Sequence, residues 1–251
     1  MQRNNNYNIL LPLLLILVFC FNFCEQKINR EKFSKVTLLK TIKLKVTEPS
    51  GLTIAKDLKS LWTVSDEDRS VYKMNLDGRI LKSFKLNGFD LEGISAINDS
   101  LLVVVFERTR EVAIVDTSGK ELKRFKLDIA GNDNKGLEGI DYNPNNNHFF
   151  VIKEKDPCLL MEYDFNFKLL RKDTLKFSTD VSGLFYNPAD SLIWILSDEN
   201  SSINIVDMHR EVKKKLDFNL IQPEGIAYNP LGNLLYVVSD RKEELYIFKI
   251  E

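Results

Sequence analysis

Histidine and cysteine are scarce in this chain, which contains 2 histidines and 3 cysteines in 251 residues. Cys20 and Cys24 lie near the N-terminus, so Cys158 is the only cysteine in the remainder. A lone cysteine cannot form an internal disulfide. Both histidines, His148 and His209, lie in segments typical of turns. We therefore expect neither a disulfide-stabilised core nor a site built on a cysteine nucleophile or a histidine base.

The chain also lacks an excess of charge of either sign. It has 35 basic and 36 acidic residues, a formal net charge of -1, and no long basic run interleaved with aromatic residues. Such a balance provides no general attraction to nucleic acid or to an anionic membrane. Nucleic-acid binding is therefore not expected. The 44% of hydrophobic residues leave ample material for a folded core.

The N-terminal apolar run, residues 9–21, is too short to span a bilayer as a helix. It contains about 13 residues, broken only by Pro12, whereas a transmembrane helix needs roughly 17–25. Arg3 precedes the run, and the chain turns polar at once from Glu25. This arrangement is typical of a signal peptide that directs export.

A cysteine just past such a run resembles a bacterial lipoprotein signal, in which the cysteine is lipidated and becomes the first residue. We favour Cys24, where the polar segment begins, over Cys20, although neither follows the usual small residue. An uncleaved anchor and a simple secretory signal are the alternatives. All three place the folded part outside the cytoplasm, anchored to a bacterial membrane in the favoured case and facing the periplasm or cell surface. We expect a signal peptide at 1–24, a linker at 25–35 and a folded domain at 36–251.

A short motif that ends in glycine recurs five times along this domain. Successive glycines are 42, 46, 44 and 42 residues apart by subtraction, and leucine or isoleucine follows each one. The glycines are Gly51, Gly93, Gly139, Gly183 and Gly225. A period in the low to middle forties is typical of a β-propeller blade, with one four-stranded sheet per repeat. We expect glycine on the innermost strand because neighbouring blades crowd there and leave no space for a side chain.

The fourth repeat shows the strands of one blade most clearly. We expect them at 181–186, 191–197, 202–206 and 212–218, separated by turn-forming residues. The second strand contains Leu-Ile-Trp-Ile-Leu, a β-branched and aromatic run that suits a strand buried on both faces. The repeats therefore predict an all-β fold of four-stranded antiparallel blades.

The two ends of the repeat set predict how the ring closes. The fifth repeat stops on its third strand, 245–250, while an extra strand at 38–46 precedes the first glycine. We expect this N-terminal strand to complete the last blade, because that pairing removes the open edge of the ring. Five blades follow from this count. A six-bladed ring is the alternative, but it needs a repeat that the sequence does not show.

Acidic residues recur at two fixed positions of the repeat. One position directly precedes the glycine, and the other follows it by 14 or 15 residues, at the end of the second strand. Because the two strands are antiparallel, both positions should converge on one face, near the mouth of the channel. Two of these ten positions are serines, Ser50 and Ser182. The other eight are acidic: Glu92, Glu138, Glu224, Asp66, Glu107, Glu154, Asp198 and Asp240.

These clustered acids require a counter-charge, because packed carboxylates either raise one another's pKa or recruit a cation. Oxygen ligands without histidine or cysteine favour a hard ion, calcium before magnesium. We therefore expect Ca²⁺ at the channel mouth. The alternative is structural: the acids could bond to backbone amides of the next blade or pair with flanking basic residues. Those basic residues are Arg69, Arg108, Lys153, Lys155, Arg241 and Lys242.

The repeat motifs carry a family resemblance. The Glu-Gly-Ile and Ser-Gly-Leu units, with Trp-Thr-Val-Ser-Asp-Glu after the first glycine and Tyr-Val-Val-Ser-Asp-Arg after the last, resemble the SdiA-regulated (YjiK-like) family over residues 36–251. The resemblance implies a β-propeller in a membrane-associated or periplasmic setting, distantly related to phytase-like and esterase-like propellers that use calcium. It implies no settled activity, and no basic rim matches a phytase-like phosphate site here.

Three functions are compatible with these features. The first is a membrane-anchored binding module whose rigid disc presents variable loops to a small ligand, a glycan or an envelope protein. The second is a calcium-dependent hydrolase of phosphoesters or esters, with metal-bound water as the nucleophile and the acids as metal ligands and base. The third is a purely structural role in an envelope complex. We favour the first.

Overall fold

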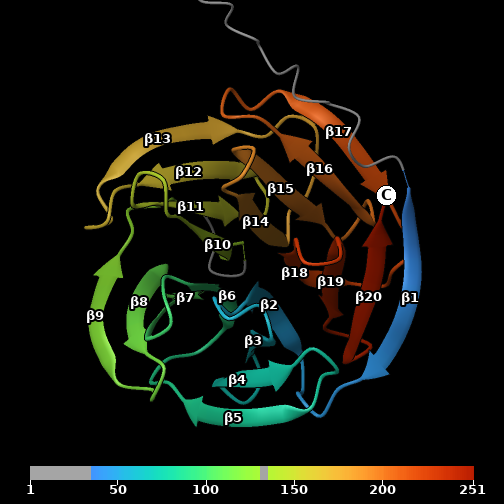
Figure 1. Cartoon of the computed structure of the whole chain (residues 1–251). Coiled ribbons are helices and arrows are strands. Elements are labelled where there is room, and N and C mark those ends of the chain that lie inside the picture. Colours follow the sequence, from blue (N-terminus) through green and yellow to red (C-terminus); the bar gives the residue numbers. More distant parts are fainter. Residues whose placement is uncertain (1–34, 131–134) are drawn as a thin grey trace, which may run out of the picture. The chain divides into compact units, whose positions relative to one another are not determined.

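Five four-stranded antiparallel sheets surround a central axis in the folded domain (Figure 1). The structure is a computed structural model that describes residues 35–130 and 135–251. The predicted signal peptide at 1–24, with Cys20 and Cys24, and all but the last residue of the predicted linker lie outside the described residues. Within them there is no helix long and apolar enough to cross a bilayer. The predicted all-β propeller with five blades is confirmed, and the six-bladed alternative is wrong.

Blades 1 to 4 each begin at one glycine motif, and their strands follow one another from the channel outwards. Blade 1 contains β2 (Pro49–Ile54), β3 (Ser60–Ser65), β4 (Ser70–Asn75) and β5 (Ile80–Lys85). Blade 2 contains β6 (Leu91–Ala96), β7 (Leu101–Phe106), β8 (Glu111–Asp116) and β9 (Glu121–Lys126). Blade 3 contains β10 (Leu137–Asn143), β11 (His148–Lys153), β12 (Leu159–Tyr163) and β13 (Leu169–Thr174). Blade 4 contains β14 (Gly183–Asn187), β15 (Leu192–Ser197), β16 (Ser202–Val206) and β17 (Val212–Asp217).

Blade 5 joins the two ends of the domain. Its inner strands are β18 (Pro223–Asn229), β19 (Leu234–Ser239) and β20 (Glu244–Ile250), and β1 (Val36–Lys43) forms its outer edge. The antiparallel register pairs Val36 with Ile250 and Lys43 with Glu244 (Figure 1). The predicted closure by the N-terminal strand is therefore confirmed. The strand ends earlier than residue 46 because Leu44 and Val46 enter the core between blades 5 and 1.

The outermost strand of each blade is its most exposed strand. Every residue of β3 is buried, whereas four of the six residues of β5 are exposed. The predicted two-sided burial of the Leu-Ile-Trp-Ile-Leu strand holds, because five of the six residues of β15 are buried and Trp194 is fully so. Both faces of the inner strands pack on neighbouring blades, so their apolar side chains form the core.

The motif glycines let adjacent blades approach closely at the axis. A Cβ atom added to Gly51 would lie 2.4 Å from the carbonyl oxygen of Glu92, and one added to Gly225 would lie 2.5 Å from that of Ser50. Such distances are too short for any side chain. In four of the five blades the backbone before one glycine thus fills the space beside another, and at Gly139 the side chains of Ile152 and Leu184 fill it.

Candidate functional site: an acidic cavity at the mouth of the channel

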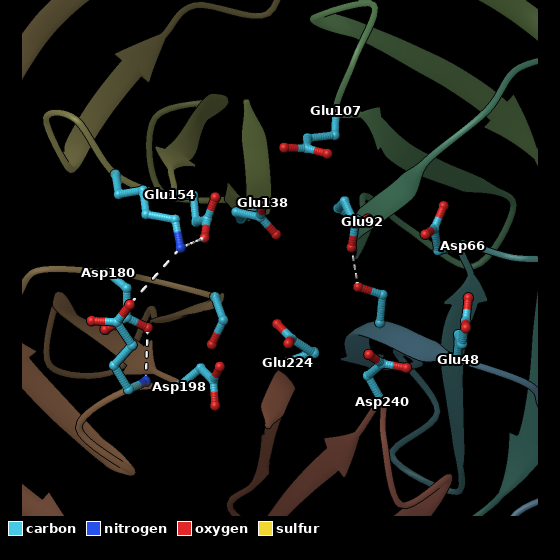
Figure 2. A pocket seen from close by; sticks show the side chains of 14 residues that line it. Glu48, Asp66, Glu92, Glu107, Glu138, Glu154, Asp180, Asp198, Glu224 and Asp240 are labelled. Atoms are coloured by element: carbon cyan, nitrogen blue, oxygen red, sulfur yellow. Dashed lines mark hydrogen bonds and ion pairs between the residues drawn. The ribbon is translucent and has the colours of Figure 1, made fainter. Parts of the chain in front are cut away.

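Fourteen residues from all five blades line a cavity of about 240 Å³ at one end of the channel (Figure 2). We call it the acidic cavity, because eleven of these residues are acidic, two are serines and one is a lysine. All ten positions singled out in the sequence are among them. The four others are Glu48, Lys155, Asp180 and Glu199. Of the described lining residues, none is histidine or cysteine.

The acids that precede the glycines reach the cavity from irregularities in the inner strands. The pairing register shifts between Leu137 and Gly139, and again between Pro223 and Gly225, so Glu138 and Glu224 lie in β-bulges. A bulge bends a strand and redirects its side chain. Similar shifts surround Ser50 in β2 and Glu92 in β6. In Figure 2, Glu92, Glu138 and Glu224 lie nearest the middle of the view.

A second ring of acids surrounds these inner residues. Each of its members is the first residue after the second strand of a blade, where the antiparallel strand returns to the same face. Figure 2 shows these side chains around the inner glutamates. They are Asp66, Glu107, Glu154, Asp198 and Asp240.

Sequence reasoning missed three acids of the cavity and one beside it. Glu48 and Asp180 line the cavity from the position three residues before the glycine, and Asp90 occupies that position in blade 2. The same position holds glycine and glutamine in the other two blades, so the repeat signal was present but incomplete. Glu199 directly follows Asp198, and nothing in the repeat marks it.

Three carboxylates form the closest cluster of the cavity. Glu107, Glu138 and Glu154 each place one oxygen within 4.8 Å of the other two (Figure 2). At the effective dielectric constant of a protein site, two full charges at that separation repel by about 3 kcal/mol. Keeping all three carboxylates ionised is therefore costly unless a proton or a cation reduces their charge.

Glu138 is the least satisfied member of this cluster. Its exposed fraction is 8%, and among the described residues no hydrogen bond or ion pair reaches its carboxylate. Glu107 accepts a hydrogen bond from the backbone nitrogen of Gly136 at 2.9 Å, and Glu154 contacts the ammonium group of Lys155. A buried carboxylate without a partner is costly, so Glu138 is the position where a cation would gain most.

Burial and mutual repulsion raise the pKa of the inner glutamates. Burial raises the pKa of Glu92 to about 8, although the hydroxyl of Ser50 donates a hydrogen bond to Oε2 and opposes the rise. The pKa values of Glu138 and Glu224 lie well above the ordinary range, because both are buried and both face Glu92. A pKa of about 8 keeps most of Glu92 protonated at neutral pH, and burial favours the protonated form of Glu138 and Glu224 as well.

The pKa values of acids in the second ring are raised as well. Burial, followed by repulsion from Asp90, raises the pKa of Asp66 to about 6. Asp90 itself forms an ion pair with Arg108. Burial is also the largest cause of raised pKa values at three further members of the ring, namely Glu107, Asp198 and Asp240. The cavity as a whole thus favours any species that brings positive charge.

Bonds to backbone amides of the next blade and ion pairs with the flanking basic residues account for only some of the acids in the cavity. Of the six flanking basic residues, only Lys155 lines it, while Lys153 donates to the backbone oxygen of Lys155. Backbone amides of the next blade reach Glu107 but not its neighbour Glu138 among the described residues. Asp180 is satisfied within its own blade by Ser197 at 2.7 Å and the backbone nitrogen of Glu199 at 2.9 Å.

The histidines and Cys158 lie away from the cavity. His209 is an exposed turn residue, as predicted. The prediction for His148 is wrong: it is the first residue of β11 and half-buried, because its Nδ1 lies 2.8 Å from Oε1 of Glu162 on the adjacent strand. Burial raises the pKa of the Cys158 thiol to about 11, so this buried group is not a nucleophile at neutral pH.

Comparison with known proteins establishes the family. A sequence model of the SdiA-regulated family matches residues 26–249, nearly the whole chain. The chain belongs to the SdiA-regulated family. This membership agrees with the resemblance carried by the glycine motifs.

Two solved structures are similar to this SdiA-regulated protein in fold. One is a glutaminyl cyclase of Myxococcus xanthus, with a TM-score of 0.69 and 10% identity, covering 86% of this chain and 96% of that one. The other is the β-propeller domain of Cps50 (Swd1) of Myceliophteria thermophila, with a TM-score of 0.50 and 13% identity, covering 82% of this chain and 65% of that one. Identities this low show a shared propeller fold and no shared activity.

Proposed function

We propose that this SdiA-regulated protein is an exported binding module that holds Ca²⁺ in the acidic cavity and uses the ion to bind its ligand. The cluster of Glu107, Glu138 and Glu154 carries this proposal. Calcium binds oxygen ligands at about 2.3–2.6 Å, so oxygens on opposite sides of the ion are roughly 4.6–5.2 Å apart. The span of at most 4.8 Å between the three carboxylates suits that size.

These three residues would hold the ion, and they leave room for a ligand. Calcium takes about 6–8 oxygen ligands, more than three carboxylates supply when each contributes one oxygen. When bound, the ion offers its remaining positions to oxygen donors such as the hydroxyls of a glycan or the carboxylates of an envelope protein. The rigid ring of blades holds the three glutamates in place, and the loops around the cavity supply selectivity.

A thermal unfolding experiment tests this proposal with Ca²⁺ alone as the probe. At 100 times its Kd, a ligand that binds only the folded state stabilises it by about 2.7 kcal/mol, or roughly 5–10 °C for a domain of this size. We expect such a rise in Tm with Ca²⁺ and its reversal by EDTA. The double variant E107Q/E138Q should lose the rise, while Glu211→Gln, an exposed acid outside the cavity, should keep it. A Tm unaffected by both Ca²⁺ and EDTA contradicts calcium binding.

A hydrolase is the second candidate function, and one observation favours it. A carboxyl group with a pKa near neutrality, such as Glu92 at about 8, suits general acid–base catalysis. The cavity has eleven acids and one lysine, so a phosphoester would be repelled unless a metal ion received it. Carboxylic esters carry no such penalty and are the better substrate class for this alternative.

Activity assays separate the binding module from the enzyme. The purified protein would be assayed on phosphate esters, on carboxylic esters and, because of its likeness to a glutaminyl cyclase, on a glutaminyl peptide, each with and without Ca²⁺. We expect no turnover above that of the E138Q/E224Q variant. Calcium-dependent turnover that this variant loses would establish the enzyme instead.

We further infer that the protein is lipidated at Cys24 and anchored to a bacterial membrane. The short apolar run and the polar segment after Cys24 support this assignment, with Cys20 as the alternative. Metabolic labelling with an alkyne fatty acid, followed by membrane fractionation, tests it. Cys24→Ser should abolish labelling and Cys20→Ser should not. Labelling lost only in Cys20→Ser would assign the lipid to Cys20. An unlabelled parent protein in the membrane fraction would favour an uncleaved anchor, and an unlabelled soluble protein would favour a simple secretory signal.

A further inference from the structure

Lys155 is the only basic residue among the described residues that line the acidic cavity. It directly follows Glu154 at the end of β11, and its ammonium nitrogen contacts Oε1 of that glutamate. The contact with Glu154 is also the largest cause of the raised pKa of Lys155. The cavity thus already contains one positive charge, which belongs to the protein itself.

Glu154 belongs to two arrangements that compete with each other. One is the ion pair with Lys155, and the other is the cluster with Glu107 and Glu138. A divalent cation bound by Glu154 would face an ammonium group in contact with one of its own ligands. Like charges repel strongly in a partly buried site, so the ammonium has to withdraw before Glu154 can serve as a full ligand.

The structure provides a second carboxylate to which the ammonium can move. Oε1 of Glu199 lies 3.9 Å from Nζ of Lys155, and the Glu199 side chain is 54% exposed. A small movement of the flexible lysine would exchange Glu154 for Glu199. The lysine therefore remains paired whether or not Glu154 is released.

Lys155 does not remove the need for a cation in the cavity. Glu138 is 8% exposed, points into the cavity and has no hydrogen-bond or ion-pair partner among the described residues (Figure 2). The ammonium contacts Glu154 but makes no ion pair with Glu138. This buried, unpartnered carboxylate is independent of the lysine and indicates that an external ion completes the site.

We propose that Lys155 is an intramolecular competitor for the cation: its ammonium group holds Glu154, moves to Glu199 when the ion binds, and so sets the affinity of the site. This inference rests on the proposed calcium binding at Glu107, Glu138 and Glu154. It assigns to Lys155 a role in tuning the site and not in holding the ligand.

Isothermal titration of the metal-depleted full-length protein with Ca²⁺ tests the inference. Lys155→Met should lower the Kd by about fivefold, the upper end of the change that corresponds to loss of one partly exposed ion pair. Lys135→Met is the matched control: Lys135 pairs with Asp156 and precedes Gly136, but it does not line the cavity. It removes a positive charge nearby without releasing a cavity carboxylate, so its Kd should change by less than about twofold.

A double-mutant cycle with Glu199→Gln tests the exchange of partners. Alone, E199Q should weaken Ca²⁺ binding, because the lysine then has no second carboxylate; in the K155M background the same change should have a much smaller effect. Equal effects in both backgrounds would overturn the exchange. A Kd for K155M that equals or exceeds that of the parent protein would overturn the competition while leaving calcium binding intact. Absence of Ca²⁺ binding in both proteins would overturn this inference and the proposed function together.

Discussion

Glu138 and Asp141 are buried carboxylates three residues apart on β10, yet their surroundings are opposite. Asp141 accepts hydrogen bonds from the hydroxyl of Ser95 in blade 2 and from the backbone nitrogen of Tyr186 in blade 4, the latter at 2.7 Å. It also accepts one from the backbone nitrogen of Tyr142 at 2.9 Å. Glu138 accepts none among the described residues. Asp141 therefore links blades 2, 3 and 4 by hydrogen bonds, whereas Glu138 has no hydrogen-bond partner among the described residues.

The difference shows how a propeller can separate stability from binding along a single strand. Burial raises the pKa of Asp141 as well, but the hydrogen bonds that it accepts oppose the rise and stabilise the ionised form. At the channel mouth the inner glutamates face one another, and burial keeps their pKa values high. Their cost is tolerated because the remaining structure is stable, which is the pattern expected of a site that meets an external ligand.

The largest effect is expected when the satisfied carboxylate is changed. Asp141→Asn replaces one accepting oxygen by a donor, so the backbone nitrogen of either Tyr186 or Tyr142 loses its acceptor, whereas the Ser95 hydroxyl can turn to accept from the amide. We expect the free energy of unfolding to fall by about 3 kcal/mol, measured by urea denaturation. Glu138→Gln is the control on the same strand. If D141N were no less stable than E138Q, the proposed contrast between the two positions would be wrong.

The next effect is a fall in stability with rising pH, caused by the acidic residues at the mouth of the channel. Groups with raised pKa, such as Glu92 at about 8 and Asp66 at about 6, bind protons more tightly in the folded state than in the unfolded state. Their contribution is fully present below about pH 4, the ordinary carboxyl range, and it is lost as the pH rises towards 8. In EDTA we expect the free energy of unfolding to fall by about 3 kcal/mol between pH 5 and 8, most of it from Glu92.

Added Ca²⁺ should oppose this loss, because it binds the ionised carboxylates and not the protonated ones. Thermal unfolding at pH 5 and pH 8, each with Ca²⁺ and with EDTA, measures both effects. The rise in Tm caused by Ca²⁺ should be larger at pH 8. Stability in EDTA that increases from pH 5 to 8 would show that the inner carboxyls are already ionised in the folded protein.

A smaller effect, of opposite sign, is expected from Glu138 itself. Glu138→Gln removes a buried carboxyl that has no partner, so the calcium-free protein should become more stable by about 1 kcal/mol at pH 8. The same variant should gain less from Ca²⁺ than the parent protein. Urea denaturation in EDTA and in Ca²⁺ provides both values, with the exposed-site variant E211Q as a neutral control. A destabilised E138Q protein in EDTA would indicate a structural role for this carboxylate.

The sequence predicted the ring and most of the mouth, because both repeat with the blades. The glycines mark positions where blades approach too closely for a side chain, and the acids keep fixed distances from those glycines. The exact register was not predictable, since β-bulges at Glu138 and Glu224 leave no separate signal in the sequence. Whether the predicted acids bind calcium stays a prediction.

The bonds between blades were beyond sequence reasoning for a different reason. Asp141 stands two residues after Gly139, and the equivalent residues in the other blades are Thr53, Ser95, Phe185 and Ala227. No single residue type recurs at this position, so it carries no repeat signal. Only the arrangement of the blades in space shows that Ser95 and Asp141 are partners. The repeats predict the features that all blades share. The contacts that distinguish one blade from another can be seen only in the structure.

The smallest effect is expected at Glu92, the one inner glutamate with a hydrogen-bond partner among the described residues. The hydroxyl of Ser50 donates a hydrogen bond to Glu92, which stabilises the ionised carboxylate and lowers its pKa, although burial keeps the value at about 8. Ser50→Ala should therefore raise the pKa of Glu92 further and lower stability by less than about 1 kcal/mol. Carboxyl ¹³C chemical shifts followed over pH measure the change, with Ser182→Ala as the matched control, because Ser182 donates to the backbone oxygen of Pro223 instead. If Ser50→Ala lowered the pKa of Glu92, or if both variants shifted it equally, the hydroxyl would not be the group that distinguishes Glu92 from Glu138.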